Sequence, residues 1–337
     1  MSTPTRQLGR NGPQVTAVGL GLMSIGGAYG QKDTEAEKLA VLDRAHAIGE
    51  RFWDTADVYF DSEDIIGKWF SQNPEKRKDI FLATKFGLQF TESFEQSERS
   101  DPEYIKEAVE KSLKRLGIET IDLYYCHRVN KNTPIEKTIQ ALAELKNQGK
   151  IRYIGLSEVS AATLRRACAV HQVSALQVEY NPFVLEIEKN EVLDACRDLG
   201  VAVVAYSPVG RGFLTGQITA LEDLPANDFR RLTPKYSPEN FVKIMDLVHR
   251  FEDVAKNHKA SPAQACLAWL MAQGEDIIPI PGTRTIKYLE QNTEAATLAL
   301  TKDEVEELRV AADATELPGD RYPAMMMGPI MGETIPL

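Results

Sequence analysis

The sequence predicts an α/β protein of the (β/α)8 TIM-barrel class. Eight short apolar runs, rich in β-branched and aromatic residues, alternate along the chain with stretches of helical period. Most of these runs start roughly 30 residues apart, which is the length of one strand with its crossover helix. Eight such units in a chain of 337 residues indicate a closed barrel of parallel strands surrounded by helices.

Each strand and each helix is predicted from the pattern of its own segment of sequence. A further helix is expected at 301–315, because Thr301 is followed three residues later by Glu304, the pattern of a capping box. Barrel strands are predicted at 17–21, 51–54, 80–85, 121–127, 151–157, 175–179, 201–206 and 277–280. Barrel helices are predicted at 34–49, 61–72, 102–116, 135–148, 160–170, 189–199, 238–258 and 285–295.

Three segments lie outside the repeating units. Residues about 5–16 contain Asn11-Gly12, a turn signal that predicts an N-terminal hairpin. An extended loop is expected at about 207–237, because the seventh and eighth strands are separated by far more than one unit. A C-terminal tail runs from about 316 to 337, and its four methionines at 325–331 could line a pocket or pack on the barrel. No linker interrupts the pattern, so residues 1–337 are predicted to form one domain.

A doubly wound nucleotide-binding sheet is the rival fold. Gly19-Leu-Gly21-Leu-Met-Ser24 comes close to the G-x-G-x-x-G fingerprint after a strand. Its third glycine is missing, and the regular spacing of eight units favours the barrel.

Composition narrows the function classes. The chain has 39 basic and 49 acidic residues and a net charge of −10, which counts against a nucleic-acid partner. Its four cysteines form no C-x-x-C pair, so no metal site is predicted. No apolar signal segment is visible, and no apolar stretch reaches the ~18 residues of a membrane span. We therefore expect a cytoplasmic protein with no membrane contact, whose oligomeric state the sequence leaves open.

Three successive predicted strands end in residues of different acid–base character. Asp54 ends the second strand, Lys85 the third and His127 the fourth, and barrel active sites lie at these strand ends. A lysine or histidine alone at such a place is usually structural or solvated, but the three together indicate a site. Asp54 can pair with Lys85, whose ammonium would lower the pKa of nearby Tyr59 and make it a general acid. His127 could then orient a carbonyl oxygen.

These residues resemble the aldo-keto reductases. The similar segments are 53–59, 83–87, 122–129, 149–157, 176–182, 205–212 and 278–284, and they run in order through most of the chain. The Asp-Leu-Tyr-Tyr-x-His-Arg-Val element of residues 122–129 is closest to the microbial and fungal branch. The resemblance implies a barrel that reduces carbonyl compounds with NADPH. It also implies a catalytic tetrad of Asp54, Tyr59, Lys85 and His127, with Tyr59 as the acid.

The same resemblance implies an NADPH/NADP+ site. Ser157 and Gln177 would hold the nicotinamide carboxamide, and Tyr206 would stack on the ring. A glycine-rich loop would fold over the pyrophosphate. Arg284 and Lys287, at a helix start, would bind the 2′-phosphate unless they are merely solvated. The full predicted cofactor set is Gly21, Met23, Ser157, Gln177, Tyr206, Ser207, Pro208, Gly210, Gly212, Leu214, Gly216, Gly282, Thr283, Arg284, Lys287, Gln291 and Asn292.

The chain departs from the family pattern at two positions. Glu158 stands where many relatives have asparagine, and Thr285 stands where they often have a second basic residue. A carboxylate at 158 could still accept a hydrogen bond from the carboxamide. The predicted substrate pocket contains Ser24, Trp53, Phe86 and Arg128, with Met23 and Tyr180 as further candidates.

Three functions remain open from the sequence. The first is reduction of an aldehyde or ketone to the alcohol by hydride transfer, with Tyr59 as proton donor and a small-molecule carbonyl compound as the partner. The second is a regulator with little turnover, since the family includes NADPH-binding potassium-channel β-subunits. The third is a dedicated biosynthetic aldehyde reductase, such as one acting on pyridoxal.

Overall fold

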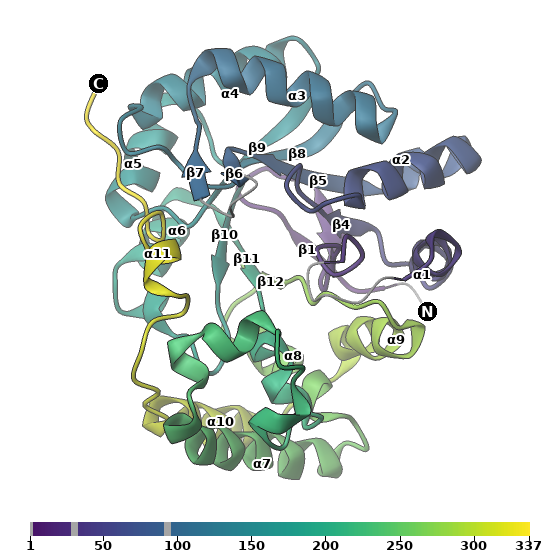
Figure 1. Ribbon diagram of the computed structural model, residues 1–337, viewed down its shortest axis with the longest axis vertical. Coiled ribbons are helices and arrows are strands. Elements are labelled where there is room, and N and C mark those ends of the chain that lie inside the picture. The colour runs from purple at the N-terminus through teal and green to yellow at the C-terminus, as the bar shows by residue number, and fades with distance from the viewer. Residues whose placement is uncertain (1–2, 28–32, 91–95) are drawn as a thin grey trace.

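A computed structural model describes residues 3–27, 33–90 and 96–337 (Figure 1). Eight parallel strands form one sheet, and hydrogen bonds between its first and last strands close it into a barrel. The Gly19 amide donates to the Pro279 carbonyl at 2.9 Å, and a parallel bridge joins Gly21 to Gly282. The predicted fold class is therefore confirmed. In order around the barrel the strands are β3 (Leu20–Gly21), β4 (Phe52–Asp54), β5 (Phe81–Phe86), β8 (Ile121–Cys126), β9 (Ile151–Ser157), β10 (Ala175–Glu179), β11 (Ala202–Tyr206) and β12 (Ile277–Pro279).

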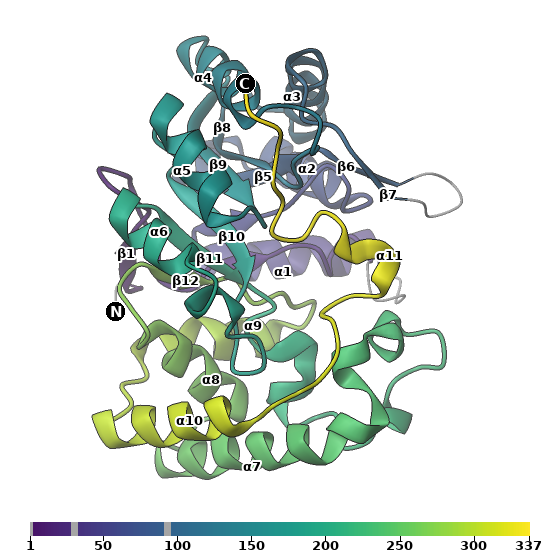
Figure 2. The ribbon, with the colours of Figure 1, turned by 90° about the vertical axis from the view of Figure 1, so that its left-hand side faces the viewer.

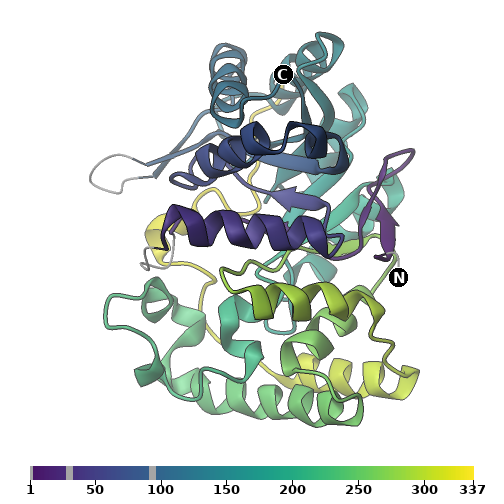
Figure 3. The same cartoon turned by 90° about the vertical axis from the view of Figure 1, so that its right-hand side faces the viewer.

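Helices cover the outside of the barrel (Figures 1 and 2). The first and last of the barrel helices, α1 and α9, pack side by side where the sheet closes (Figure 3). The helices of the barrel layer are α1 (Glu35–Ala47), α2 (Ser62–Gln72), α3 (Pro102–Leu116), α4 (Ile135–Asn147), α5 (Ala161–Val170), α6 (Val192–Leu199), α7 (Phe241–Asn257), α8 (Pro262–Met271) and α9 (Ile286–Glu294). Within the described ranges, no helix is long and apolar enough to cross a membrane.

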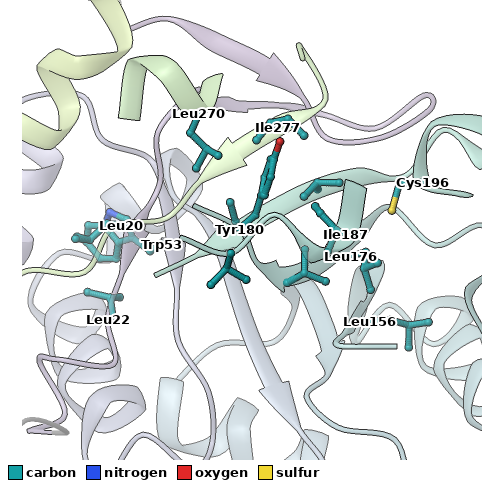
Figure 4. Close-up of a cluster of buried hydrophobic side chains, with 14 of the residues drawn as sticks. Leu20, Leu22, Trp53, Leu156, Leu176, Tyr180, Ile187, Cys196, Leu270 and Ile277 are labelled. Carbon is teal, nitrogen blue, oxygen red and sulfur yellow. The ribbon is translucent and has the colours of Figure 1, made fainter. Parts of the chain in front are cut away.

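Strand side chains alternate between two cores. Phe52, Leu123, Tyr125 and Val204 belong to a buried cluster inside the barrel. Their neighbours along each strand point outward and pack against the helices, in a larger cluster shown in part in Figure 4. Because both faces of every strand are buried, the strands read as continuous apolar runs rather than as polar–apolar alternation.

The barrel's amino end is closed by a hairpin. Strand β1 (Thr5–Gln7) pairs antiparallel with β2 (Gln14–Thr16). Leu8 and Val15 from this hairpin join the cluster inside the barrel. Arg6 holds it in place by donating to the carbonyls of Met271, Gly274 and Ile277.

The glycines of the rival nucleotide-binding motif have a packing role. A Cβ added to Gly19 would lie 2.8 Å from a ring carbon of Phe52 and 2.9 Å from a methyl carbon of Ile280. On Gly21, an added Cβ would lie 2.8 Å from the Ile280 carbonyl oxygen. The absence of side chains here lets β3 approach β12, so these glycines close a barrel instead of opening a doubly wound sheet.

The segment between β11 and β12 differs from the expectation in one respect. Short 3-10 turns fill most of 210–240, but two helices follow instead of the single helix predicted at 238–258. The missed helix is α8, whose residues 265–271 are all buried and mostly apolar, so it shows no polar face and no period. Its start does carry a signal, the capping box of Ser261 and Gln264. A small hairpin of β6 (Leu88–Phe90) and β7 (Gln96–Glu98) was also not predicted.

The chain ends by crossing the carboxyl side of the barrel. Helix α10 (Lys302–Ala314) begins at the predicted capping box, where the Thr301 amide donates to Glu304 at 2.9 Å. The tail then runs past the short helix α11 (Ala324–Met327) toward α4 and α5 (Figure 2). The Gly332 amide anchors it by donating to the Glu158 carbonyl at 2.7 Å. This path brings the tail to the strand ends that carry the predicted site.

Candidate active site

The structure brings the four residues of the predicted tetrad together. Lys85 is fully buried, and its Nζ lies 2.5 Å from Asp54 Oδ1 and 2.7 Å from the Thr55 carbonyl. The same nitrogen lies 4.9 Å from the centre of the Tyr59 ring. The Tyr59 and His127 rings meet edge to face at 5.7 Å. The arrangement follows from topology, because β4, β5 and β8 are neighbours and their carboxyl ends share one rim.

Gln177 is part of this cluster. Its Nε2 donates to Asp54 Oδ2 at 2.8 Å. Asp54 thus accepts from Lys85 on one oxygen and from Gln177 on the other, which locks the carboxylate in place. The sequence had assigned Gln177 to a bound carboxamide only.

Burial decides how Tyr59 titrates. The sequence-based expectation was a pKa lowered by Lys85. Burial raises the pKa of Tyr59, and Lys85 does not offset it, so the pKa lies above its ordinary value. The expectation is therefore wrong in direction, and Tyr59 keeps its proton at neutral pH. Burial lowers the pKa of Lys85, but Asp54 and Tyr59 raise it by more, so this side chain remains an ammonium.

His127 is neutral in this environment. Burial, Arg128 and Lys85 together hold the pKa of His127 well below its usual value. Its Nδ1 is fully buried and has no hydrogen-bond partner among the described residues. This nitrogen is therefore unpaired in either neutral tautomer. In the tautomer that carries the proton on Nε2, His127 can donate it to a substrate oxygen.

Ser157, Gln177 and Tyr206 lie on three adjacent strands. Gln177 is paired in register with Ser157, and Glu179, two residues further along β10, with Tyr206. The Ser157 hydroxyl accepts from Arg128 Nη1 at 3.0 Å, which leaves its own proton free to donate. Tyr206 is partly exposed. This rim therefore presents a hydroxyl, an amide and a partly exposed aromatic ring. Such a set can bind a flat ring that carries an amide group.

The glycine-rich loop is folded on itself. Ser207, Gly210, Arg211, Gly212 and Gly216 all have positive φ, so the backbone winds tightly. The amides of Gly210, Gly212 and Leu214 donate to carbonyls of residues 207 and 209 at 2.9–3.2 Å. The Leu214 side chain is buried in the core, and the Pro208 carbonyl accepts from Cys266. In this conformation these amides are not available to a phosphate, contrary to the expectation from sequence.

The predicted 2′-phosphate site already contains a carboxylate. Arg284 Nη1 lies 2.8 Å from both carboxylate oxygens of Asp33. Lys287, Gln291 and Asn292 follow on α9, and the hydroxyl of Thr283 accepts from the Thr285 amide at 3.1 Å. The sequence offered no signal for Asp33, because it lies 251 residues from Arg284.

Two residues predicted to line the substrate pocket do not. Trp53 is buried between the barrel and α2, 4.8 Å from Trp69 between ring centres (Figure 4). Phe86 packs at 4.9 Å against Tyr124 in the same outer layer. Successive strand residues point to opposite faces, so the inward Asp54 and Lys85 send their neighbours outward.

Tyr180 is also outside the site, since it lies in the cluster of buried apolar side chains (Figure 4). Its hydroxyl donates to Glu188. Ser24 is 9% exposed and lies beside Gly282, and Met23 is partly exposed. Gly21 and Gly282 serve barrel closure. Arg128 does lie at the site, next to Ser157.

Glu158 is engaged by the tail. Arg321 binds both its carboxylate oxygens, at 3.0 and 2.9 Å, and both side chains are almost completely buried. Burial raises the pKa of Glu158, but Arg321 lowers it by more, so the group stays ionised. The Tyr206 hydroxyl donates to the same carboxylate at 2.8 Å. Glu158 therefore orients Tyr206 and is not free to accept from a carboxamide.

The tail extends this network to the glycine-rich loop. Arg211 lies 3.0 Å from Glu179, and its guanidinium stacks 4.3 Å above the Tyr322 ring. The Tyr322 and Tyr206 hydroxyls are 3.0 Å apart. Arg211, Arg321 and Tyr322 were not predicted from the sequence. A signal was present, because a buried glutamate at a usually neutral position requires a cation nearby. Within the described ranges, no group of His, Cys, Asp and Glu side chains could hold a metal ion.

Comparisons with known proteins show which family the chain belongs to. The model of the aldo/keto reductase family matches residues 17–313. The aldo-keto reductase str7 of Strobilurus tenacellus is 50% identical over 96% of each chain. The aldo-keto reductase yakc [NADP(+)] of Schizosaccharomyces pombe is 49% identical over 100% of this chain and 99% of its own.

Solved structures show the same similarity. A glycerol dehydrogenase from Gluconobacter oxydans superposes with a TM-score of 0.84 at 28% identity, over 95% of this chain and 98% of its own. A thermostable aldo-keto reductase in complex with the inhibitor epalrestat gives a TM-score of 0.74 at 29% identity, over 92% of this chain and 100% of its own. This chain therefore belongs to the aldo/keto reductase family of oxidoreductases.

Proposed function

We propose that this protein reduces an aldehyde or ketone to the corresponding alcohol with NADPH. The observation that carries the proposal is the buried Lys85–Asp54 pair beside Tyr59, opposite a neutral His127. This set suits a reaction in which a carbonyl oxygen gains negative charge and then a proton. When bound, the cofactor supplies the hydride that reaches the carbonyl carbon.

The protein's own residues act on the oxygen. His127 Nε2 and the Tyr59 hydroxyl bind it, and Tyr59 transfers its proton to it as the carbonyl carbon is reduced. The raised pKa of Tyr59 keeps that proton in place until charge develops on the oxygen. The Lys85 ammonium stabilises the phenolate that is left, and Asp54 and the Thr55 carbonyl hold Lys85 in position.

NADPH is the proposed cofactor because the relative yakc carries NADP(+) in its name and because the residues present suit it. Ser157 and Tyr206 would hold the nicotinamide end. Arg284 and Lys287 would bind the 2′-phosphate. Arg284 would then either contact Asp33 and the phosphate together or lose its ion pair with Asp33. The loop of residues 210–216 would open to release its amides.

The test is cofactor oxidation, followed by absorbance, on a panel of aldehydes and ketones with NADPH and NADH in parallel. The panel includes nitrobenzaldehyde, pyridoxal and a dicarbonyl. Because one structural relative is named a glycerol dehydrogenase, alcohols with NADP+ are assayed as well. Tyr59→Phe should abolish turnover while NADPH still binds, as measured by fluorescence.

The outcomes separate the candidate functions. Undiminished turnover in Tyr59→Phe would refute the role of Tyr59 as the acid. Tight NADPH binding without turnover on any substrate would instead support the regulatory alternative. Selective turnover of pyridoxal would support the biosynthetic one.

A further inference from the structure

We propose that Arg128 forms a subsite that selects carbonyl substrates carrying a carboxylate group. This inference deepens the proposed function and rests on it. The subsite lies beside the carbonyl-binding residues, because Arg128 directly follows His127 and its Nη1 lies 3.0 Å from the Ser157 hydroxyl.

The Arg128 side chain is buried and forms no ion pair with any described residue. The residue is 7% exposed, and its Nη1 donates to the His127 carbonyl at 2.6 Å and to Ser157. Both acceptors are neutral. Among the residues that the structure describes, no carboxylate lies within ion-pair distance of its guanidinium, although most other buried cations have one.

Part of this guanidinium remains available. Its Nε and Nη2 have no hydrogen-bond partner in the described ranges, and neither is among the fully covered polar atoms. Two donors on one edge of a guanidinium match the two oxygens of a carboxylate, in a geometry that a lysine cannot reproduce.

The charge balance around Arg128 favours an anion. Arg321 is neutralised by Glu158, and Arg211 by Glu179, with all four side chains nearly inaccessible to solvent. At the rim Glu186 and Lys235 add one charge of each sign. Lys85 is neutralised by Asp54. This leaves the charge of Arg128 as the surplus.

A buried charge without a partner is costly, and an incoming anion would relieve that cost. The electrostatic neighbours of Arg128 are Tyr206, Glu158, Tyr322 and Tyr59. Glu158 lies beyond ion-pair distance of Arg128 and is already paired with Arg321. An anion bound to Arg128 would therefore sit within a few bonds of a carbonyl held by Tyr59 and His127. A substrate with both groups, such as a 2-oxo acid or a carboxylated aromatic aldehyde, would use both features at once.

The experiment compares each acid with its neutral methyl ester, using phenylglyoxylate and the ortho, meta and para carboxybenzaldehydes. The wild type should prefer at least one acid over its ester. Arg128→Gln should lower kcat/KM for that acid roughly 10- to 100-fold, the range expected for lost hydrogen bonds to a charged group. The ester should change less than about threefold. Arg128→Lys should fall between the two, because it keeps the charge and loses the paired donors.

Arg99→Gln is the matched control, since Arg99 is 45% exposed and paired with Asp101; both substrates should be unaffected. The affinity for NADPH is measured in every variant to show that the fold is intact. Equal losses for acid and ester in Arg128→Gln would overturn the proposal, since Arg128 would then act on the reacting carbonyl or on the fold. A wild type that never prefers an acid would overturn it too.

A failure of the proposed function is recognised separately. If the wild type reduces no carbonyl compound, calorimetry with benzoate on the NADPH-loaded protein still tests the subsite. Binding to the wild type but not to Arg128→Gln would support the subsite without the reaction. Equal binding, or none, would refute it.

Discussion

Replacing Arg321 by methionine is expected to lower the free energy of unfolding by about 3–5 kcal/mol at neutral pH, the usual effect of removing one partner of a buried ion pair. Arg321 and Glu158 are 2% and 0% exposed, so solvent screening does not reduce this value. Arg321 also lies near two other carboxylates. Glu179, at 3.5 Å, keeps Arg211 as its cation, and Glu186 adds little because it is 45% exposed. The loss therefore comes from Glu158, which would remain buried without its cation.

The sign of the pH dependence is also set by this pair. In the wild type the pKa of Glu158 lies below its ordinary 4.5, so its contribution to stability is present above that pH and is lost at lower pH. Without Arg321, burial would raise the pKa of Glu158 above 4.5, and stability would fall as the pH rises through that new value. The difference between wild type and variant should therefore grow from about pH 5 to about pH 8.

Urea unfolding at these two pH values measures both effects, with Glu158→Gln and the double variant completing a thermodynamic cycle. The double variant should recover much of the loss, because it buries no unpaired carboxylate. A loss below about 1 kcal/mol that does not change with pH would refute the reasoning. A double variant less stable than Arg321→Met alone would refute it as well.

Three further outcomes follow from single contacts. Burial raises the pKa of Glu50 to about 8. Its contribution to stability is therefore full below pH 4.5 and is lost as the pH rises to about 8. Within that window Glu50→Gln should reduce the fall in the free energy of unfolding by about 1.4 kcal/mol per pH unit, as measured by urea unfolding, and an unchanged slope would contradict the prediction. Gly19→Ala should lower the free energy of unfolding by about 1–3 kcal/mol, because the new Cβ would lie 2.8 Å from Phe52. Gly328→Ala is the neutral control, since nothing lies within 4 Å of its added Cβ. Equal melting temperatures of the two variants would exclude the clash. Arg284→Ala should weaken NADPH binding far more than NADH binding, and Asp33→Asn should strengthen NADPH binding alone, as titrated by fluorescence; equal shifts for both cofactors would mean that Arg284 does not bind the 2′-phosphate.

The repeating pattern of apolar runs and helical stretches was enough to predict the barrel. Parallel strands buried on both faces produce that pattern locally, so no long-range information was needed. The same holds for the residues at the strand ends: once the strands were placed, Asp54, Lys85 and His127 had to meet at one rim. Alternation along a strand also implies that Trp53 and Phe86 point outward once Asp54 and Lys85 point inward. Helix α8 was not predicted because its residues 265–271 are buried and mostly apolar, so no polar face reveals its period.

Tertiary structure decided everything that depends on partners distant in sequence. Glu158 meets Arg321 across 163 residues, and Arg284 meets Asp33 across 251. Whether a charge is paired depends on such contacts, which no local pattern encodes. The pKa of Tyr59 is a similar case: the sequence indicated the neighbouring ammonium, but burial outweighs it. Desolvation depends on how the whole chain packs around a group, and only the folded chain determines that.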